Sequence, residues 1–265
     1  MNNVLTKVVA GILVNNEKVY LFKRKSEAFK DLYEFPGGKV EENETNQQAL
    51  KRELMEELDI DVTVGRKICE KKNHEIAITA FLISSFRGTI TLKEHKDFIL
   101  IDQKTIRDYP LVDIDVSIAE DLFKNHVLIF SSKLGNIKIT GNHINITSVS
   151  FTEEEECDSD IDILNVCKKQ LKEYLHNERK YFDLPLHVEG TDFQKQIWEK
   201  TSKIEYGSTL TYSQLHKGAR AAGSALSRNR HLIIIPCHRV TRKDSTGNYR
   251  GGTDRKIKLL AIERR

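Results

Sequence analysis

The sequence lacks any long apolar run, which excludes a membrane-spanning helix of about 20 consecutive apolar residues. Its first residues, MNNVLTKVVAG, lack a basic start followed by a sustained apolar stretch. We therefore expect no signal peptide, a cytoplasmic location and no membrane partner. A hydrophobic content of 39% and a charged content of 31% are typical of a soluble globular chain.

Cysteine is scarce and scattered. Cys69, Cys157, Cys167 and Cys237 form no C-x-x-C pair, and no Cys/His cluster has the spacing of a zinc site. A disulfide framework is not expected in a reducing compartment, so each cysteine is interpreted singly. Cys167 falls in an amphipathic pattern and is assigned to packing.

The chain also lacks an internal repeat and a Gly-, Ser- or Pro-rich linker, yet its 265 residues exceed the ~100–200 residues of one domain. We therefore expect two tightly joined domains of the α/β (α+β) class. In the first, strands are expected at 7–14, 18–24 and 75–86, and helices at 45–58, with Thr45 as N-cap, and 115–123. In the second, we expect a small antiparallel sheet at 126–132, 136–140 and 144–151, and helices at 162–178 and 190–204.

Charge is unevenly distributed, although the net charge is only +3. From His216 to Arg265 the chain has 13 Lys or Arg residues against 3 Asp or Glu residues, an excess of 10. Such a patch is typical of a nucleic-acid-binding surface, and a solvated basic face is the alternative.

Three carboxylates are spaced to share one face of the first expected helix. Glu53, Glu56 and Glu57 follow an i, i+3, i+4 pattern, and like charges packed so closely destabilise a bare helix. The pattern favours a site for a hard cation such as Mg²⁺, with a solvated acidic face as the alternative. Arg52 can pair with Glu44 and hold the preceding loop.

The wider pattern resembles the Nudix box, on Gly38, Glu44, Arg52, Glu53, Leu54, Glu56, Glu57 and Ile60. Asp59 stands where the family has glycine, at a helix end that needs a left-handed residue. Aspartate tolerates this conformation at a small cost in stability. The resemblance covers about residues 1–122. It implies an α/β/α sandwich that hydrolyses nucleoside diphosphates linked to another group, with Mg²⁺ or Mn²⁺ as cofactor.

The resemblance also assigns residues. The implied metal ligands are Glu53, Glu56, Glu57 and Glu94, and Glu53 and Glu57 are implied to be catalytic, one of them acting as or positioning a base. Gly37, Gly38 and Lys39 are implied to bind substrate, where glycine lets the backbone approach a metal or phosphate closely. The segments YEFPGGK and YPLVDID resemble the nucleotide-pool-cleaning branch, which implies nucleoside triphosphates as substrates and a base contact from Asp115. Which nucleotide is preferred stays open.

One cysteine stands in an unusual setting, because the apolar run LIII is followed by Pro236, Cys237, His238 and Arg239. We expect the isoleucines to form a buried strand that delivers Cys237 to a pocket, with Pro236 making the turn. A neighbouring base can generate a nucleophilic thiolate, and a core cysteine is the alternative. Since adjacent side chains of an extended chain point apart, His238 is expected to act on Cys237 through water or through the helix that follows rather than by direct contact.

Five segments resemble the O6-alkylguanine-DNA alkyltransferase family in the same order: GTDFQKQIWEKTSKIEYGSTLTYSQL, ARAAGSALSRN, IIIPCHRV, GNYRGG and KIKLLAIE. The resemblance covers about residues 126–265. It implies a ribonuclease-H-like sheet subdomain at 126–186 and a mainly helical domain of winged-helix or helix-turn-helix type at 187–265. No cofactor is implied for this half.

By this resemblance Cys237 accepts an alkyl group from the O6 of guanine in one irreversible transfer, and Glu263 orients His238, which deprotonates the thiol. The guanine must leave the base stack to be reached. The residues assigned to base and DNA binding are Tyr212, Arg220, Asn229, Arg239 and Tyr249. Within this set Tyr249 would line the guanine pocket, Arg220 would fill the gap left by the flipped base, and Asn229 would brace the active-site loop.

Two departures from the family concern DNA binding. Only seven residues separate Tyr212 from Arg220, where the family has a longer segment with a Gly-x-Pro turn, and Gly218 is the remaining turn candidate. Arg230 stands where the family has proline. We expect a bifunctional monomer that acts on nucleoside triphosphates and on alkylated DNA. It stays open whether duplex binding survives, or whether the second half binds lesions or free nucleotides without efficient repair.

Overall fold

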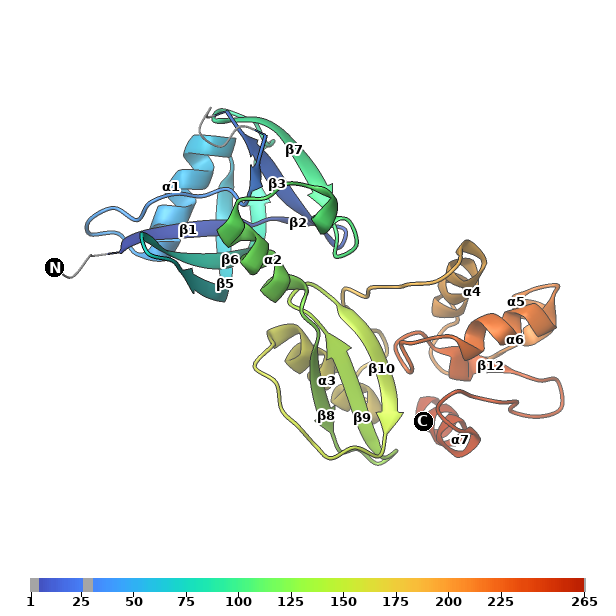
Figure 1. Ribbon diagram of the computed structural model, residues 1–265. Helices are drawn as coiled ribbons and strands as arrows, with labels where there is room; N and C mark the ends of the chain where they lie inside the picture. The colour runs from blue at the N-terminus through green and yellow to red at the C-terminus, as the bar shows by residue number, and fades with distance from the viewer. Residues whose placement is uncertain (1–4, 26–30, 265) are drawn as a thin grey trace. The chain divides into compact units, whose positions relative to one another are not determined.

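The computed structural model describes residues 5–25 and 31–264, so the outer ends of the two expected domains, 1–4 and 265, lie outside the described residues. The chain forms two compact units, residues 1–124 and 125–265. Both units combine helices with sheets, which confirms the predicted fold class (Figure 1). Among the described helices, none is long and apolar enough to cross a membrane.

The first unit contains two sheets. Strands β1 (Thr6–Ile12), β6 (Ile76–Arg87) and β5 (Asp61–Lys72) form one sheet in the order β1-β6-β5, with β1 parallel and β5 antiparallel to β6. In the other sheet, β3 (Lys18–Arg24) pairs antiparallel with β2 (Val14–Asn15), β4 (Tyr33–Glu34) and β7 (His95–Ile101). The helices in the described part of this unit are α1 (Asn46–Leu58), η2 (Ile106–Asp108) and α2 (Asp113–Phe123). The sequence patterns did not predict β5 and β7.

Helix α1 is fixed at both ends and on one face. Thr45 caps its N-terminus in a reciprocal capping box with Gln48, as predicted. Asp59 ends it in the left-handed conformation (φ 59°, ψ 38°), as the departure from the Nudix box required. Leu50 and Leu54 share a core cluster with Val9 of β1. Because the apolar residues of α1 face this core, Glu53 and Glu56 are left on the remaining face, whereas Glu57 is buried.

The second unit begins with the predicted antiparallel sheet. Strands β8 (His126–Phe130), β9 (Asn136–Gly141) and β10 (Ile146–Thr152) pair in the order β10-β9-β8, and α3 (Asp162–Leu175) packs against them (Figure 1). The helices that follow are α4 (Asp192–Ser202), α5 (Tyr212–Leu215), α6 (Ala219–Ser227), η3 (Cys237–Arg239) and α7 (Thr253–Glu263). Strands β11 (Leu210–Thr211) and β12 (Val240–Thr241) form a short parallel pair.

Two hydrophobic clusters hold the second unit together. One joins the sheet and α3 to Ile233 and to Leu259 of α7, and the other gathers Trp198, Leu226 and Val240. The first cluster includes residues on both sides of position 186. The sheet subdomain and the helical part therefore share a core.

The predicted buried strand before Cys237 is wrong. His231 makes an isolated bridge to Val149, and residues 232–234 form a turn that ends in a bend at Ile235. Ile233 has a φ of 75°, a left-handed conformation that β-branched residues rarely adopt. Ile233 packs in the sheet cluster, whereas Ile235 packs in the helical cluster. An isoleucine run indicates burial but not conformation, and here successive residues are buried on opposite sides of a turn.

Candidate active sites

The acidic face of α1 is organised by one arginine. Arg52 Nη2 donates to Glu44 Oε1 at 2.8 Å and to the Lys39 carbonyl at 3.0 Å. Its Nη1 contacts Glu53 at 2.9 Å and Glu56 at 3.3 Å. The predicted Arg52–Glu44 pair is therefore present, and the same guanidinium ties the glycine loop to the helix.

The glycine loop lies directly against the carboxylates. A Cβ on Gly38 would lie 2.3 Å from the Glu53 carboxylate, and a Cβ on Gly37 would lie 2.1 Å from the Val9 carbonyl oxygen. The Gly37 N–H donates to Glu57 Oε2 at 3.0 Å. Only glycine at both positions allows this close approach of backbone and helix.

Glu57 is 8% exposed, and burial raises its pKa to about 8, with Glu34, Glu53 and Glu94 adding to the effect. Burial also raises the pKa of Glu53. Crowded carboxylates of this kind are stabilised by a cation, and carboxylate oxygens suit Mg²⁺ or Mn²⁺. The glycine cradle and the donor chemistry thus fit such an ion. In the described part of the chain, no group of three or more acidic, His or Cys side chains could hold one as arranged, so the four glutamate ligands remain a prediction.

A second buried carboxyl lies in the first turn of α2. Asp115 is 3% exposed, and burial raises its pKa to about 8, with Glu34 adding to the shift. Asp115 Oδ1 has no hydrogen-bond partner among the described residues. Glu34 is itself buried and pairs with Arg24 and, at 3.3 Å, with His95. Sequence reasoning missed Glu34, although it stands in the segment YEFPGGK.

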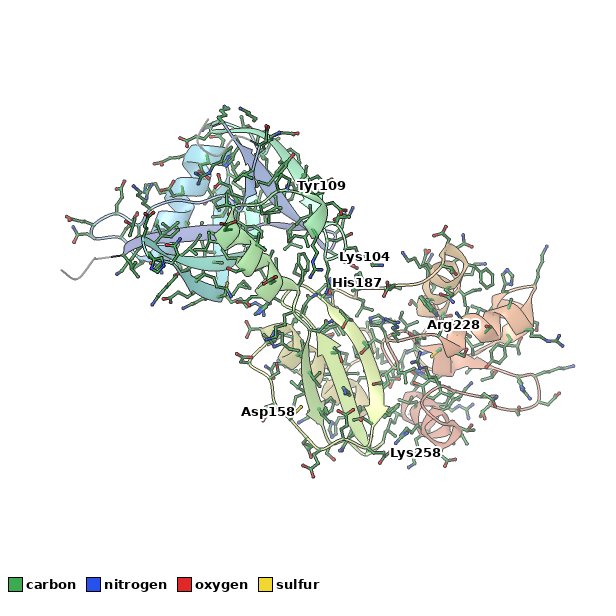
Figure 2. The ribbon with its side chains drawn as sticks, in the orientation of Figure 1. Lys104, Tyr109, Asp158, His187, Arg228 and Lys258 are labelled. Atoms are coloured by element: carbon green, nitrogen blue, oxygen red, sulfur yellow. The ribbon has the colours of Figure 1, made fainter. Side chains whose placement is uncertain are left out.

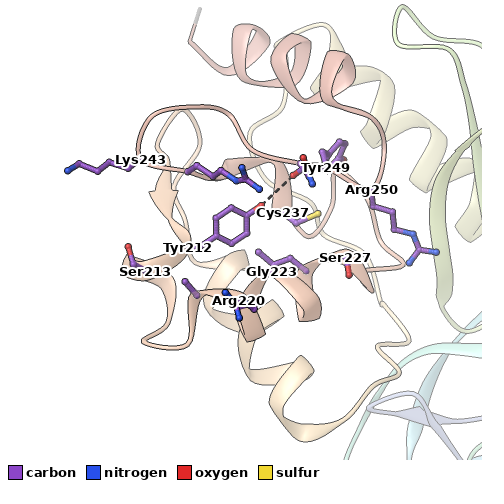
Figure 3. A pocket seen from close by; sticks show the side chains of 13 residues that line it. Tyr212, Ser213, Arg220, Gly223, Ser227, Cys237, Lys243, Tyr249 and Arg250 are labelled. Atoms are coloured by element: carbon purple, nitrogen blue, oxygen red, sulfur yellow. Dashed lines mark hydrogen bonds between the residues drawn. The ribbon is translucent and has the colours of Figure 1, made fainter.

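In the second unit, Cys237 lies in a cavity of about 760 Å³ (Figure 3). Tyr212, Arg220 and Tyr249, all assigned from the sequence, line this cavity with it. The other cationic residues that line it are Arg242, Lys243 and Arg250. None of the described lining residues is acidic, so the cavity suits an anionic polymer such as a nucleic acid.

Asn229 braces the cysteine loop, as predicted. Its Nδ2 donates to the Ile235 carbonyl at 3.0 Å and lies 3.1 Å from Cys237 Sγ. Its Oδ1 accepts the His231 N–H at 2.8 Å. One fully buried amide therefore holds the irregular turn and donates to the sulfur.

His238 and Glu263 form the predicted pair. His238 Nε2 lies 2.9 Å from Glu263 Oε1, and His238 Nδ1 is buried with no partner among the described residues. Burial lowers the pKa of His238, against the raising effect of Glu263. If Nε2 carries the proton toward Glu263, Nδ1 is left as an acceptor, which is the state a general base requires.

Glu263 accepts more donors than the sequence indicated. The Tyr174 hydroxyl donates at 2.5 Å, and Arg239 Nε contacts both carboxylate oxygens at 3.0 Å. Burial alone would raise the pKa of Glu263, but the hydrogen bonds from His238, Arg239 and Tyr174 hold it at about 2. Arg239, assigned to DNA binding from the sequence, is instead buried in this ion pair and does not line the cavity.

Burial of Cys237 favours the protonated form of its thiol. Burial raises the pKa of Cys237 to about 11, against opposing effects from Asn229 and Lys256. Lys256 is fully buried, and its Nζ donates to the Val240 carbonyl at 2.6 Å. Burial lowers the pKa of Lys256 to about 8. Sequence reasoning missed Lys256, although it stands in KIKLLAIE, because its side chain is placed near the sulfur only by folding.

The shortened helix-turn-helix segment still reaches the cavity. Helix α5 has four residues and begins at Tyr212, and Gly218 precedes α6 as the predicted turn residue. Tyr212 donates to the Asn248 carbonyl at 3.4 Å (Figure 3). Tyr212 and Arg220 therefore line the same cavity although only seven residues separate them.

These features define a chain with a hydrolase-type acidic helix in one unit and a buried, activatable cysteine in the other. Family models match residues 5–109 as "NUDIX domain", residues 126–188 as "6-O-methylguanine DNA methyltransferase, ribonuclease-like domain", and residues 192–265 as the "DNA binding domain" of that methyltransferase. The chain belongs to the methylated-DNA–protein-cysteine methyltransferase family over its second unit and carries a NUDIX domain in its first.

Individual relatives match one unit each. The constitutive methylated-DNA–protein-cysteine methyltransferase of Bacillus subtilis is 34% identical over 53% of this chain and 96% of its own length. The Mycobacterium tuberculosis OGT structure in complex with DNA is 31% identical, covers 52% of this chain and 92% of that chain, and has a TM-score of 0.48. A structure from a study of MutT from Aliivibrio salmonicida and Vibrio cholerae is 26% identical to this chain. The match covers 44% of this chain and 95% of that chain, with a TM-score of 0.41.

Proposed function

We propose that the chain is a bifunctional nucleic-acid maintenance enzyme. Its second unit transfers an alkyl group from the O6 of guanine in DNA to Cys237, once per protein molecule. Its first unit hydrolyses nucleoside triphosphates with Mg²⁺ or Mn²⁺. The observation that carries the proposal is that His238, hydrogen-bonded to Glu263, directly follows Cys237, and that Cys237 lines a cationic cavity.

The transfer step follows from the protonation states. A water between His238 Nδ1 and the thiol carries the Cys237 proton to the imidazole, and Glu263 stabilises the imidazolium that forms. The sulfur then forms a bond to the alkyl carbon while the carbon–O6 bond breaks. The electron pair of the broken bond stays on O6 of the guanine. The Tyr249 hydroxyl is buried without a partner among the described residues, so it can donate a hydrogen bond to O6 as the carbon–O6 bond breaks. Lys256 lowers the cost of the thiolate.

Hydrolysis in the first unit depends on the loop and α1. Bound Mg²⁺ would supply phosphate charge neutralisation and a more acidic water. Glu53 and Glu57 would bind the ion, and one of them would act as or position the general base. Gly37 and Gly38 would let phosphates approach the backbone. Asp115 Oδ1 would receive a hydrogen bond from the base.

One observation favours a second candidate for the second unit. Helix α5 has only four residues, so the element that grips duplex DNA is short. Transfer from free alkylated guanine, or lesion binding without efficient duplex repair, is therefore the alternative.

Intact-mass measurement tests these possibilities. The protein is incubated with O6-benzylguanine and, separately, with a duplex carrying O6-methylguanine, with Cys237→Ser as control. We expect mass gains of one benzyl and one methyl group in the wild-type chain alone. No gain with either substrate would refute the transfer, and a gain with the free base alone would establish the alternative.

A further inference from the structure

A second recess lies in the same unit as the Cys237 cavity. Its volume is about 380 Å³, and Arg228, Arg230 and Arg250 line it. Glu189 is the single acidic side chain among the described residues that line the recess. Three guanidinium groups against one carboxylate give it a positive excess and suit it to an anion.

The recess adjoins the cavity. Arg250 lines both, and Ser227 of the cavity directly precedes Arg228 of the recess in the chain. Arg250 Nη1 donates to the Asn229 carbonyl at 3.2 Å, which links the recess to the residue that braces Cys237. In Figure 3 the Arg250 side chain lies on the opposite side of Cys237 from Lys243. A strand whose nucleotide enters the cavity can therefore place a neighbouring phosphate in the recess.

The floor of the recess is firmly packed, whereas its arginines are exposed. A Cβ on Gly190 would lie 2.7 Å from the Trp198 ring, and the Trp198 indole N–H donates to the Ala225 carbonyl at 3.0 Å. Arg230 Nη1 lies 3.4 Å from Glu189, and both side chains are largely in solvent, so this ion pair contributes little and can be exchanged for a phosphate. Arg228 lies at the C-terminal end of α6 (Figure 2).

We propose that this recess binds a backbone phosphate of the DNA strand that carries the alkylated guanine. The proposal rests on DNA being the substrate of the second unit. Guanidinium groups bind phosphate through two parallel hydrogen bonds, and a cluster of them gives binding that weakens with salt. Because α5 has only four residues, the recess offers this chain a phosphate contact outside that helix.

Salt-dependent DNA binding tests the recess in the full chain. Arg228→Gln/Arg230→Gln is compared with Lys203→Gln/Lys258→Gln, which removes two exposed charges elsewhere in the unit (Lys258 is seen in Figure 2). Binding of an unmodified duplex is titrated from 50 to 200 mM salt, about the range over which phosphate contacts dominate. We expect the arginine variant to lower the salt slope by about 1–2 and to bind about tenfold more weakly, with the lysine variant close to wild type.

Two further readouts separate the outcomes. The rate of reaction with free O6-benzylguanine should be unchanged in the arginine variant. If this rate fell by as much as the affinity for duplex DNA, the proposal would be overturned, because these residues would then act in the active centre. Equal salt slopes in the two double variants would also overturn it. A third readout is the ability of O6-methyl-dGMP to compete with O6-benzylguanine for the protein. If the arginine variant weakened this competition but left duplex binding unchanged, the proposal would also be overturned, because the recess would then bind the phosphate of a free nucleotide. The titration needs no transfer, so it decides the recess even if the wild type fails to react.

Discussion

The Tyr174 hydroxyl donates a 2.5 Å hydrogen bond to Glu263 Oε1 and also lies 3.2 Å from His238 Nε2. Tyr174 belongs to α3 of the sheet subdomain, and Glu263 ends α7. The shared carboxylate oxygen therefore connects the two parts of the second unit at the active centre. The hydroxyl proton points to Glu263, which favours a His238 that donates from Nε2 and accepts at Nδ1.

Tyr174→Phe should slow transfer while the unit stays folded. A hydrogen bond to a charged group contributes about 1.5–3 kcal/mol, so we expect a roughly tenfold lower rate with O6-benzylguanine. The rate of mass gain between pH 6 and 8 measures the effect. Tyr206→Phe is the control, because that hydroxyl donates to Asn177 instead. Equal rates in the two variants would contradict a role for Tyr174 in positioning Glu263.

Glu263→Gln should change how stability depends on acidity. The pKa of Glu263 is about 2 in the folded chain against an ordinary 4.5. A lowered pKa gives stabilisation that is complete above the ordinary value and is lost as pH falls toward 2. The variant should lose this dependence. At neutral pH it should also be about 3–5 kcal/mol less stable, because Arg239 is left buried without its charge partner.

The single tryptophan of the chain makes this measurement specific. Trp198 is buried in the second unit, so its fluorescence during urea unfolding reports that unit alone. The comparison runs from pH 7 to about 3.5, which includes the upper part of the range between 4.5 and about 2 over which this stabilisation is lost. Glu205→Gln, at an exposed position, is the control. A Glu263→Gln profile parallel to that of the control would show that the ion pair is not the source of the acid sensitivity.

Glu57→Gln should separate stability from hydrolysis. Glutamine keeps an oxygen to accept the Gly37 N–H but removes a buried carboxylate whose pKa burial raises to about 8. Without added metal the first unit should be at least as stable as wild type. Hydrolysis should fall by about 10²–10⁴-fold, and Mg²⁺ should no longer raise the melting temperature. Glu120→Gln is the control, and retained turnover in the Glu57 variant would refute the metal assignment.

Asp59→Gly should stabilise α1 through the backbone. Asp59 has a φ of 59°, which costs an L-residue up to about 1 kcal/mol more than glycine. Its exposed ion pair with Lys93, at 2.7 Å, opposes the gain by at most about 1 kcal/mol. Asp59→Asn also loses the ion pair but keeps the Cβ, so the glycine variant should unfold at higher temperature than the asparagine variant. The reverse order, measured by circular dichroism, would contradict a strained helix end.

The sequence by itself determined the local features and marked the candidate reactive residues. Thr45 and Gln48 fix the start of α1 because a capping box needs only residues three apart, and Asp59 shows where the helix turns left-handed. The Nudix spacing and the PCHRV segment were recognisable because their chemistry depends on short, fixed intervals. The predicted strand before Cys237 failed because apolar runs do not distinguish a strand from a buried turn.

Only the tertiary structure decided which distant groups meet. Tyr174 reaches Glu263 from 89 residues away, and no periodicity links two positions on separate helices. Arg239 turned from a DNA-binding assignment into the buried partner of Glu263, since its direction depends on how η3 packs against α7. Lys256 and Glu34 gained their influence on Cys237 and Glu57 by burial, which raises the strength of every nearby charge. The sequence therefore marks the candidate nucleophile and acids, and the fold sets their burial and hydrogen bonds.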